Sequence, residues 1–185
     1  VTTYRRMEEK IIAPRLAPGV LDGEPFDQAL FERGNHKKPL HKVPRRFLEA
    51  IDDTPYPKDS IGRLEFAKDL LRDDNPFTTR VIVNRVWHHL FGNGLVRTTD
   101  NFGKLGELPS HPELLDYLSQ KFREEQWSIK GMIRFLVNSE AFRASSNPSP
   151  KAIEIDPQNL LLSHANLRRL EAEAIRDAML LASGR

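Results

Sequence analysis

The sequence predicts a mainly α-helical protein, an irregular multi-helix bundle with a long proline-rich N-terminal excursion. From about residue 58 onward, apolar residues recur at the spacing of one helix face in several successive segments. Between Pro18 and Pro57 the chain is punctuated by prolines and is predicted to be mostly irregular. The 185 residues are 39% hydrophobic and 29% charged, which fits a single globular helical domain over residues 1–185.

The N-terminal part, residues 1–57, is predicted to be irregular apart from two helices. One covers Thr3–Ala13, which Pro14 ends, and a short one covers Arg45–Ile51. We expect little other regular structure there. This part also holds a locally basic run, which indicates a polyanion as a partner, although a solvated loop explains the charges as well. Its cations are Arg33, Lys37, Lys38, Lys42, Arg45 and Arg46.

The central part, residues 58–144, is predicted to begin with helices over 61–71 and 78–91. Gly92 and Gly94 end the second of these helices. Its apolar residues cover about half of the circumference, which predicts a central, buried helix. On the other arc, two pairs at i,i+4 spacing can meet, namely Asn84 with His88 and Arg85 with His89.

A helical hairpin or helix-turn-helix is predicted next. Ser110 and Glu113 have the form of a capping box, so a helix is expected to start at Ser110. A turn at Gln126 and Trp127 leads to Ser128, the expected N-cap of a second helix. Residues 145–155 are predicted to be a flexible link. The C-terminal helices, within 156–185, are expected over 157–164 and 168–183.

Four polar residues around the glycine-rich loop are the candidate catalytic groups: Arg85, His89, Asp100 and His111. With His88 and Glu107, the histidines and the aspartate could also be metal ligands. Adjacent histidines on a helix point about 100° apart, and no His-Glu-x-x-His pattern is present, so we predict no metal and no cofactor. The alternative is a structural network in which Asp100 or Asn101 pairs with Arg85 or Arg97.

Composition excludes several classes of function. The absence of cysteine excludes disulfides, thiolate metal sites and c-type haem attachment within this segment. The formal net charge of +2 implies no nucleic-acid or membrane partner by itself. No apolar run approaches the roughly 20 residues that span a bilayer. No G-x-S-x-G nucleophile motif is present, which disfavours a hydrolase of that class. Whether the chain is an enzyme of another kind stays open.

Four ordered blocks resemble a known family. They are GRLEFAKDL from Gly62, RVIVNRVWHHLFGNGLVRTTDNFG from Arg80, LPSHPELLDYL from Leu108 and RRLEAEAIRDA from Arg168. They are similar to a planctomycete-specific domain of unknown function, found C-terminal in large proteins that begin with cytochrome-c-like modules. The resemblance implies an exported, cell-envelope, multidomain parent and no established catalytic residues. We also expect the chain to be a piece of a longer protein, with any targeting signal outside it.

Three functional hypotheses follow. The first is an interaction or scaffolding module whose partners are other domains of the same parent protein, including a cytochrome-c-like module. The second is an enzyme domain that acts on a cell-envelope polymer through His89, Asp100 and His111. The third is nucleic-acid binding through Lys130 and Arg134 of the predicted hairpin, which the acidic residues at its turn disfavour.

Overall fold

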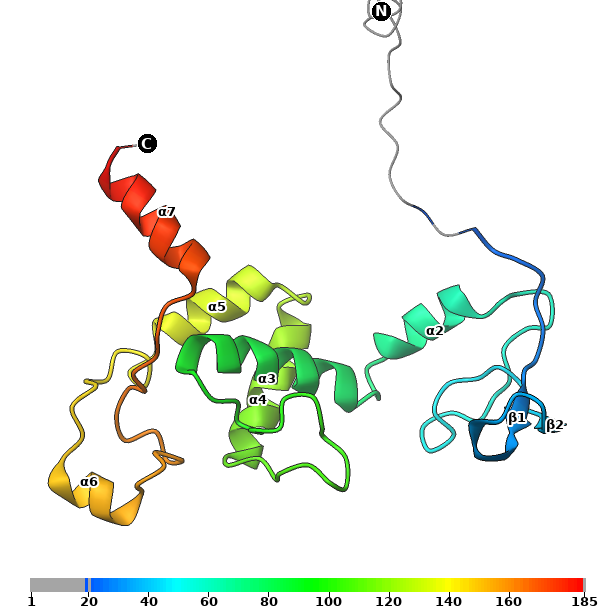
Figure 1. Ribbon diagram of the computed structural model, residues 1–185, viewed down its shortest axis with the longest axis horizontal. Helices are drawn as coiled ribbons and strands as arrows, with labels where there is room; N and C mark the ends of the chain where they lie inside the picture. The colour runs from blue at the N-terminus through cyan, green and yellow to red at the C-terminus, as the bar shows by residue number, and fades with distance from the viewer. Residues whose placement is uncertain (1–18, 20, 185) are drawn as a thin grey trace, which may run out of the picture. The chain divides into compact units, whose positions relative to one another are not determined.

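The computed structural model describes Gly19 and residues 21–184 (Figure 1). The predicted helix over Thr3–Ala13 lies outside the described residues. The mainly helical fold class is confirmed, because the described residues form six α-helices and only one small two-stranded sheet. The chain divides into two compact units, one ending at Arg72 and the other beginning at Asp73. The assignment of one domain to residues 1–185 stays a prediction.

The first unit contains a β-hairpin where little regular structure was predicted. Strand β1 (Ala29–Phe31) pairs antiparallel with β2 (Pro39–Lys42), with an irregularity in the pairing. The register places Ala29 opposite Lys42 and Phe31 opposite Pro39. A one-turn 3-10 helix, η1 (Glu32–Gly34), opens the connecting loop. Its left-handed residues, Arg33 at φ 51° and Gly34 at φ 77°, turn the chain sharply back.

The predicted helix over Arg45–Ile51 is wrong. The backbone N–H of Arg45 donates to Asp27 Oδ1 at 3.1 Å, and its carbonyl accepts from the Tyr56 N–H at 2.7 Å. These partners lie outside the segment, so the backbone groups that would begin a helix are already engaged. A single turn remains, in which the Ile51 N–H donates to the Leu48 carbonyl at 2.8 Å.

Helix α2 (Arg63–Leu70) closes the first unit within the predicted range of 61–71. It starts after Gly62, whose φ of 84° and close packing on Tyr56 leave no room for a side chain: a Cβ would lie 2.6 Å from the Tyr56 ring. Phe47 is the buried hydrophobic side chain of this unit among the described residues, and its ring lies 6.1 Å from that of Phe66.

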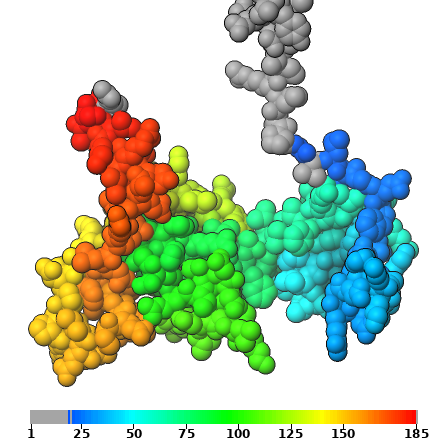
Figure 2. All heavy atoms as spheres, in the orientation of Figure 1, coloured from blue at the N-terminus to red at the C-terminus, as the bar shows by residue number. Residues whose placement is uncertain are grey.

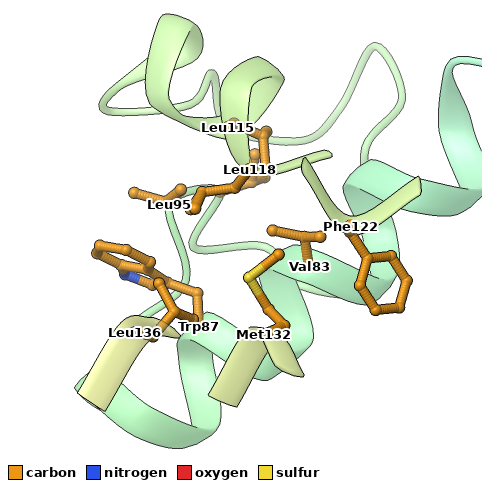
Figure 3. Close-up of a cluster of buried hydrophobic side chains, with 9 residues drawn as sticks. Val83, Trp87, Leu95, Leu115, Leu118, Phe122, Met132 and Leu136 are labelled. Carbon is orange, nitrogen blue, oxygen red and sulfur yellow. The ribbon is translucent and has the colours of Figure 1, made fainter. Parts of the chain in front are cut away.

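Helix α3 (Phe77–Phe91) is the centre of the second unit, as predicted. Helices α4 (Pro112–Glu124) and α5 (Ile129–Val137) pack against it. Its Val83 and Trp87 enter one apolar core with side chains from both neighbours (Figure 3). The remaining buried members of that core are Leu95, Val96, Leu115, Leu118, Phe122, Met132 and Leu136.

The turn between α4 and α5 lies at Gln126 and Trp127, as predicted, and has an unusual backbone. Both residues are left-handed, with φ of 54° and 60°. The Trp127 N–H reaches the Phe122 carbonyl at 2.9 Å and the Gln126 N–H reaches that of Arg123 at 2.9 Å, the two bonds of a Schellman motif. The Trp127 and Phe122 rings meet edge to face at 5.5 Å, which adds the apolar contact of this motif.

The two predicted N-caps of this hairpin have different outcomes. Ser128 is confirmed, because its hydroxyl accepts from the Gly131 N–H at 3.1 Å. The capping box at Ser110 is wrong, since α4 begins one residue later with His111 at the cap position and Pro112 as its first residue. The Ser110 N–H instead donates to the Leu95 carbonyl at 2.8 Å, and its hydroxyl contacts the His111 ring at 3.0 Å.

The predictions after residue 144 are displaced along the chain. A helix, α6 (Pro150–Ile155), stands inside the predicted flexible link, capped by the hydroxyl of Ser149. The predicted helix over 157–164 is a series of turns, because Asp156 Oδ2 accepts from the Leu161 N–H at 2.6 Å and Asn159 is left-handed. The last helix, α7 (Ala172–Ala182), starts four residues later than expected.

Candidate functional site

The predicted pairing of Asp100 with Arg85 is present. Arg85 Nη2 donates to Asp100 Oδ1 at 3.1 Å. The two side chains are 57% and 87% exposed, so water screens the pair and its contribution to stability is about 0–1 kcal/mol. The i,i+4 pairs predicted on α3 do not form, since Arg85 pairs with Asp100 and Asn84 bonds elsewhere.

The two candidate histidines lie apart from this ion pair in their contacts. The His89 ring is exposed and meets His88 edge to face at 5.7 Å, and the His111 Nδ1 contacts the Ser110 hydroxyl at 3.0 Å. In the described part of the chain, Arg85 and Asp100 are therefore the members of the candidate set that contact each other. No group of three or more His, Asp or Glu side chains gathers there in a way that could hold a metal ion.

The residue that organises this region is Asn84, which sequence reasoning placed on the polar arc of the helix. It is fully buried on α3, and its amide makes two bonds with one backbone unit. Asn84 Nδ2 donates to the Val96 carbonyl at 2.9 Å, and its Oδ1 accepts from the Val96 N–H at 2.9 Å. Gly94 fits beside this clamp because a Cβ there would lie 2.4 Å from the Val96 carbonyl oxygen.

The loop beyond the clamp is ordered by its own hydrogen bonds. The Thr98 hydroxyl donates to the Asn101 carbonyl at 2.8 Å and accepts from the Glu107 N–H at 3.0 Å. Gly106 packs so closely that a Cβ there would lie 2.0 Å from the Asn101 carbonyl oxygen. The glycine-punctuated stretch is therefore a structural loop in which several backbone groups are satisfied by nearby partners.

A later segment returns to the C-terminal end of α3. Asn166 Nδ2 donates to the Phe91 carbonyl at 3.1 Å, and a guanidinium N–H of Arg168 donates to the His89 carbonyl. The last carbonyls of a helix lack intrahelical partners, so this segment caps α3 from 75 or more residues away. The anchoring accounts in part for the late start of α7, since the side chains of Asn166 and Arg168 are tied to α3 and these residues have no helical backbone.

A second asparagine shapes the same segment. Asn159 Nδ2 donates to the His164 carbonyl at 2.7 Å and to Asn166 Oδ1 at 3.0 Å. Asp156, at the start of this segment, accepts hydrogen bonds from the backbone N–H groups of Leu161 and Leu160. These bonds lower the pKa of Asp156 and favour the turn over 156–161. The sequence alone does not predict this network, because the segment bonds to α3 residues 75 or more positions away.

A hollow of about 200 Å³ lies between this segment and the end of α3. Its walls include Leu90, Phe91 and Phe142, and the rings of Phe91 and Phe142 meet edge to face at 5.6 Å. Its polar lining comes from His164, Asn166 and Arg168. None of the lining residues is a carboxylate, serine or threonine, so the hollow lacks a pair of groups for acid–base or nucleophilic catalysis.

These observations define a class: a helical module built on one central helix, with a clamped structural loop beside which Arg85 and Asp100 are the candidate residues in contact. Within that class the chain belongs to the PSD1 family, described as a protein of unknown function (DUF1553), whose model matches residues 62–185. No curated protein and no solved structure matches the chain. Among the described residues, no helix has both the length and the apolar character that crossing a membrane requires.

Proposed function

We propose that this chain is a helical interaction module and that α7 is its docking element. The exposed apolar side of α7 supports the proposal. No residue of this helix is buried, and Ile175 and Met179, which share one side of it, are 37% and 67% exposed (α7 is red in Figure 2). Large apolar side chains concentrated on one helix are typical of a protein contact surface.

The length of α7 strengthens this argument. An isolated helix of its 11 residues is marginal in water, and helices of this size gain most of their stability from packing an apolar face. Ile175, Ala178, Met179 and Ala182 follow one another on successive turns of one arc. Full burial of an exposed apolar side chain contributes about 1.5–3 kcal/mol, so covering Met179 at 67% exposure would gain most of that amount and covering Ile175 at 37% a smaller part.

The partner that fits α7 is an apolar surface that covers Ile175 and Met179. At about 100° per residue, Glu173 and Asp177 lie on the opposite side of the helix, where a partner on the apolar side leaves them in water. We assign this partner to another domain of the same parent protein. The setting that the resemblance implies, an exported planctomycete cell-envelope protein with cytochrome-c-like modules, is part of the proposal.

Amide hydrogen exchange on the intact parent protein and on this chain alone tests the assignment. We expect α7 amides to exchange rapidly in the isolated chain and to be protected in the intact protein. The double variant Ile175→Ser, Met179→Ser should lose that protection. Its matched control, Arg169→Ser with Arg176→Ser, should keep it.

Two outcomes would overturn the proposal. Equal exchange of α7 in both proteins would mean that no domain covers it. A dimer of the isolated chain in light scattering, abolished by Ile175→Ser and Met179→Ser, would mean that a second copy is the partner instead.

Neither alternative hypothesis has a comparable observation in its favour. For the enzyme, His89 and His111 contact neither each other nor the ion pair in the described part of the chain. For nucleic-acid binding, Lys130 and Arg134 are exposed on α5, but Glu124 and Glu125 flank the turn before α5. The interaction module therefore stands as the proposal.

A further inference from the structure

The hairpin of the first unit carries a local excess of positive charge. From Ala29 to Val43 there are four cations and one carboxylate, a net charge of +3. Residues 21–72 as a whole carry ten cations and ten carboxylates, so the excess belongs to the hairpin and is balanced elsewhere in the same unit. Such an asymmetry creates a local positive potential despite the balanced total.

The structure divides the six cations of the basic run into two classes. Arg45 pairs with Asp27 at 3.0 Å and Arg46 with Glu49 at 2.8 Å, and both arginines are half-buried. Lys38 pairs with Glu32 at 3.1 Å. The other three, Arg33, Lys37 and Lys42, are exposed and form no ion pair within the described residues, although the charge of Lys42 is near enough to Asp27 to help lower the pKa of that carboxyl.

The tip of the hairpin has a fixed shape. Asn35 Oδ1 accepts from the Lys37 N–H at 3.0 Å, and the Asn35 carbonyl accepts from the Lys38 N–H at 2.9 Å. The Glu32 N–H donates to the Lys38 carbonyl at 3.1 Å and closes the loop. Arg33 and Lys37 are therefore held on one short loop, which lowers the entropy lost when both contact one ligand.

We propose that Arg33, Lys37 and Lys42 bind a linear sulfated polysaccharide along the hairpin. Lys42 stands at the far end of β2, about 10 Å from the tip by the rise of a strand, so the three charges suit a chain rather than a single ion. Phe31 of β1 is half-buried, and the exposed residues from Glu32 to Lys42 include no Phe, Tyr or Trp on which bases could stack. Stacking rings are a main feature of single-stranded nucleic-acid sites, so the hairpin favours a polymer that offers charge alone.

Fluorescence anisotropy of labelled dextran sulfate with the full chain, over a range of salt concentrations, tests this site. Arg33→Asn, Lys37→Gln and Lys42→Gln together should weaken binding by about tenfold or more at low salt, and should reduce the slope of log K against log salt by about 2–3. Asn is the choice at position 33 because it tolerates the left-handed backbone there.

The matched control removes the same charge from the second unit, with Lys104→Gln, Lys130→Gln and Arg134→Gln. It should leave the affinity within about twofold, since these cations lie off the hairpin. Equal losses in the two triple variants, or no binding of dextran sulfate by the unchanged chain, would overturn the site. Tighter binding of single-stranded DNA than of dextran sulfate at equal charge concentration would overturn the ligand class.

Discussion

Each of the two units of this chain is stabilised by a different kind of interaction. The second unit buries nine apolar side chains in one core around α3. The first buries the apolar side chain of Phe47 and relies on polar contacts, among them Arg45 with Asp27 and Arg72 with Asp52 at 2.6 Å. Apolar burial responds weakly to pH and salt, whereas partly exposed ion pairs respond to both. Solution conditions should therefore separate the two units.

The largest expected effect is in the apolar core. Phe122→Ala should destabilise the second unit by about 3–5 kcal/mol, because it removes a fully buried ring and leaves a cavity. Both tryptophans, Trp87 and Trp127, belong to this unit, so denaturant unfolding followed by tryptophan fluorescence reports on it. The control, Phe66→Ala, lies in the first unit and should leave that transition in place. An equal shift of the unfolding midpoint by both variants would show that the two units do not unfold independently.

The next effect concerns the polar clamp within the same core. Asn84→Ala should cost about 2–4 kcal/mol, because the Val96 N–H and carbonyl would both be left buried without a partner. Asn93→Ala is the matched control, since Asn93 is an exposed asparagine close by on the same loop and makes no side-chain hydrogen bond. If the two variants unfold at the same denaturant concentration, the clamp does not stabilise the fold.

A pH-dependent effect should appear in the first unit. Hydrogen bonds from Thr54, followed by the bond from Arg72, lower the pKa of Asp52 to about 2. The unfolded value is about 3.9, so this stabilisation is complete above that pH and is lost as pH falls toward 2. NMR signals of Tyr56 should report the loss.

The variants Asp52→Asn and Asp53→Asn separate the cause of that effect. Asp52→Asn should reduce the pH dependence of the first unit between pH 4 and 2 without abolishing it, because Asp27 and Glu65 also have lowered pKa values and still titrate. Asp53→Asn changes an exposed neighbour and should keep the original profile. An unchanged profile in Asp52→Asn would assign the acid sensitivity to another group.

The smallest effect is expected at the candidate site. Asp100→Ala should change stability by less than about 0.5 kcal/mol, because its pair with Arg85 is exposed and leaves no buried group unpaired. Thermal unfolding measures this change. A loss above about 1 kcal/mol would show that the ion pair holds the loop and that the two units are less different than their contacts indicate.

Sequence patterns predicted the second unit better than the first, for a physical reason. The periodicity of α3 and its glycine stop are local signals, and α3 ends at Phe91 as expected. The role of Asn84 was missed because its partner lies 12 residues away on an irregular loop. Pairing between distant residues determines the hairpin at Ala29–Lys42 and the non-helical backbone at Arg45. Local propensity does not predict such pairing.

The capping of α3 by Asn166 and Arg168 has a mechanical consequence. Asn166 and Arg168 hold carbonyls in the last turn of α3, and only residues 169–171 separate them from α7. A pull or a rotation applied to α7 would therefore reach the central helix through a three-residue tether, without first unravelling a long linker. A partner that binds α7 would therefore act directly on the C-terminal end of α3.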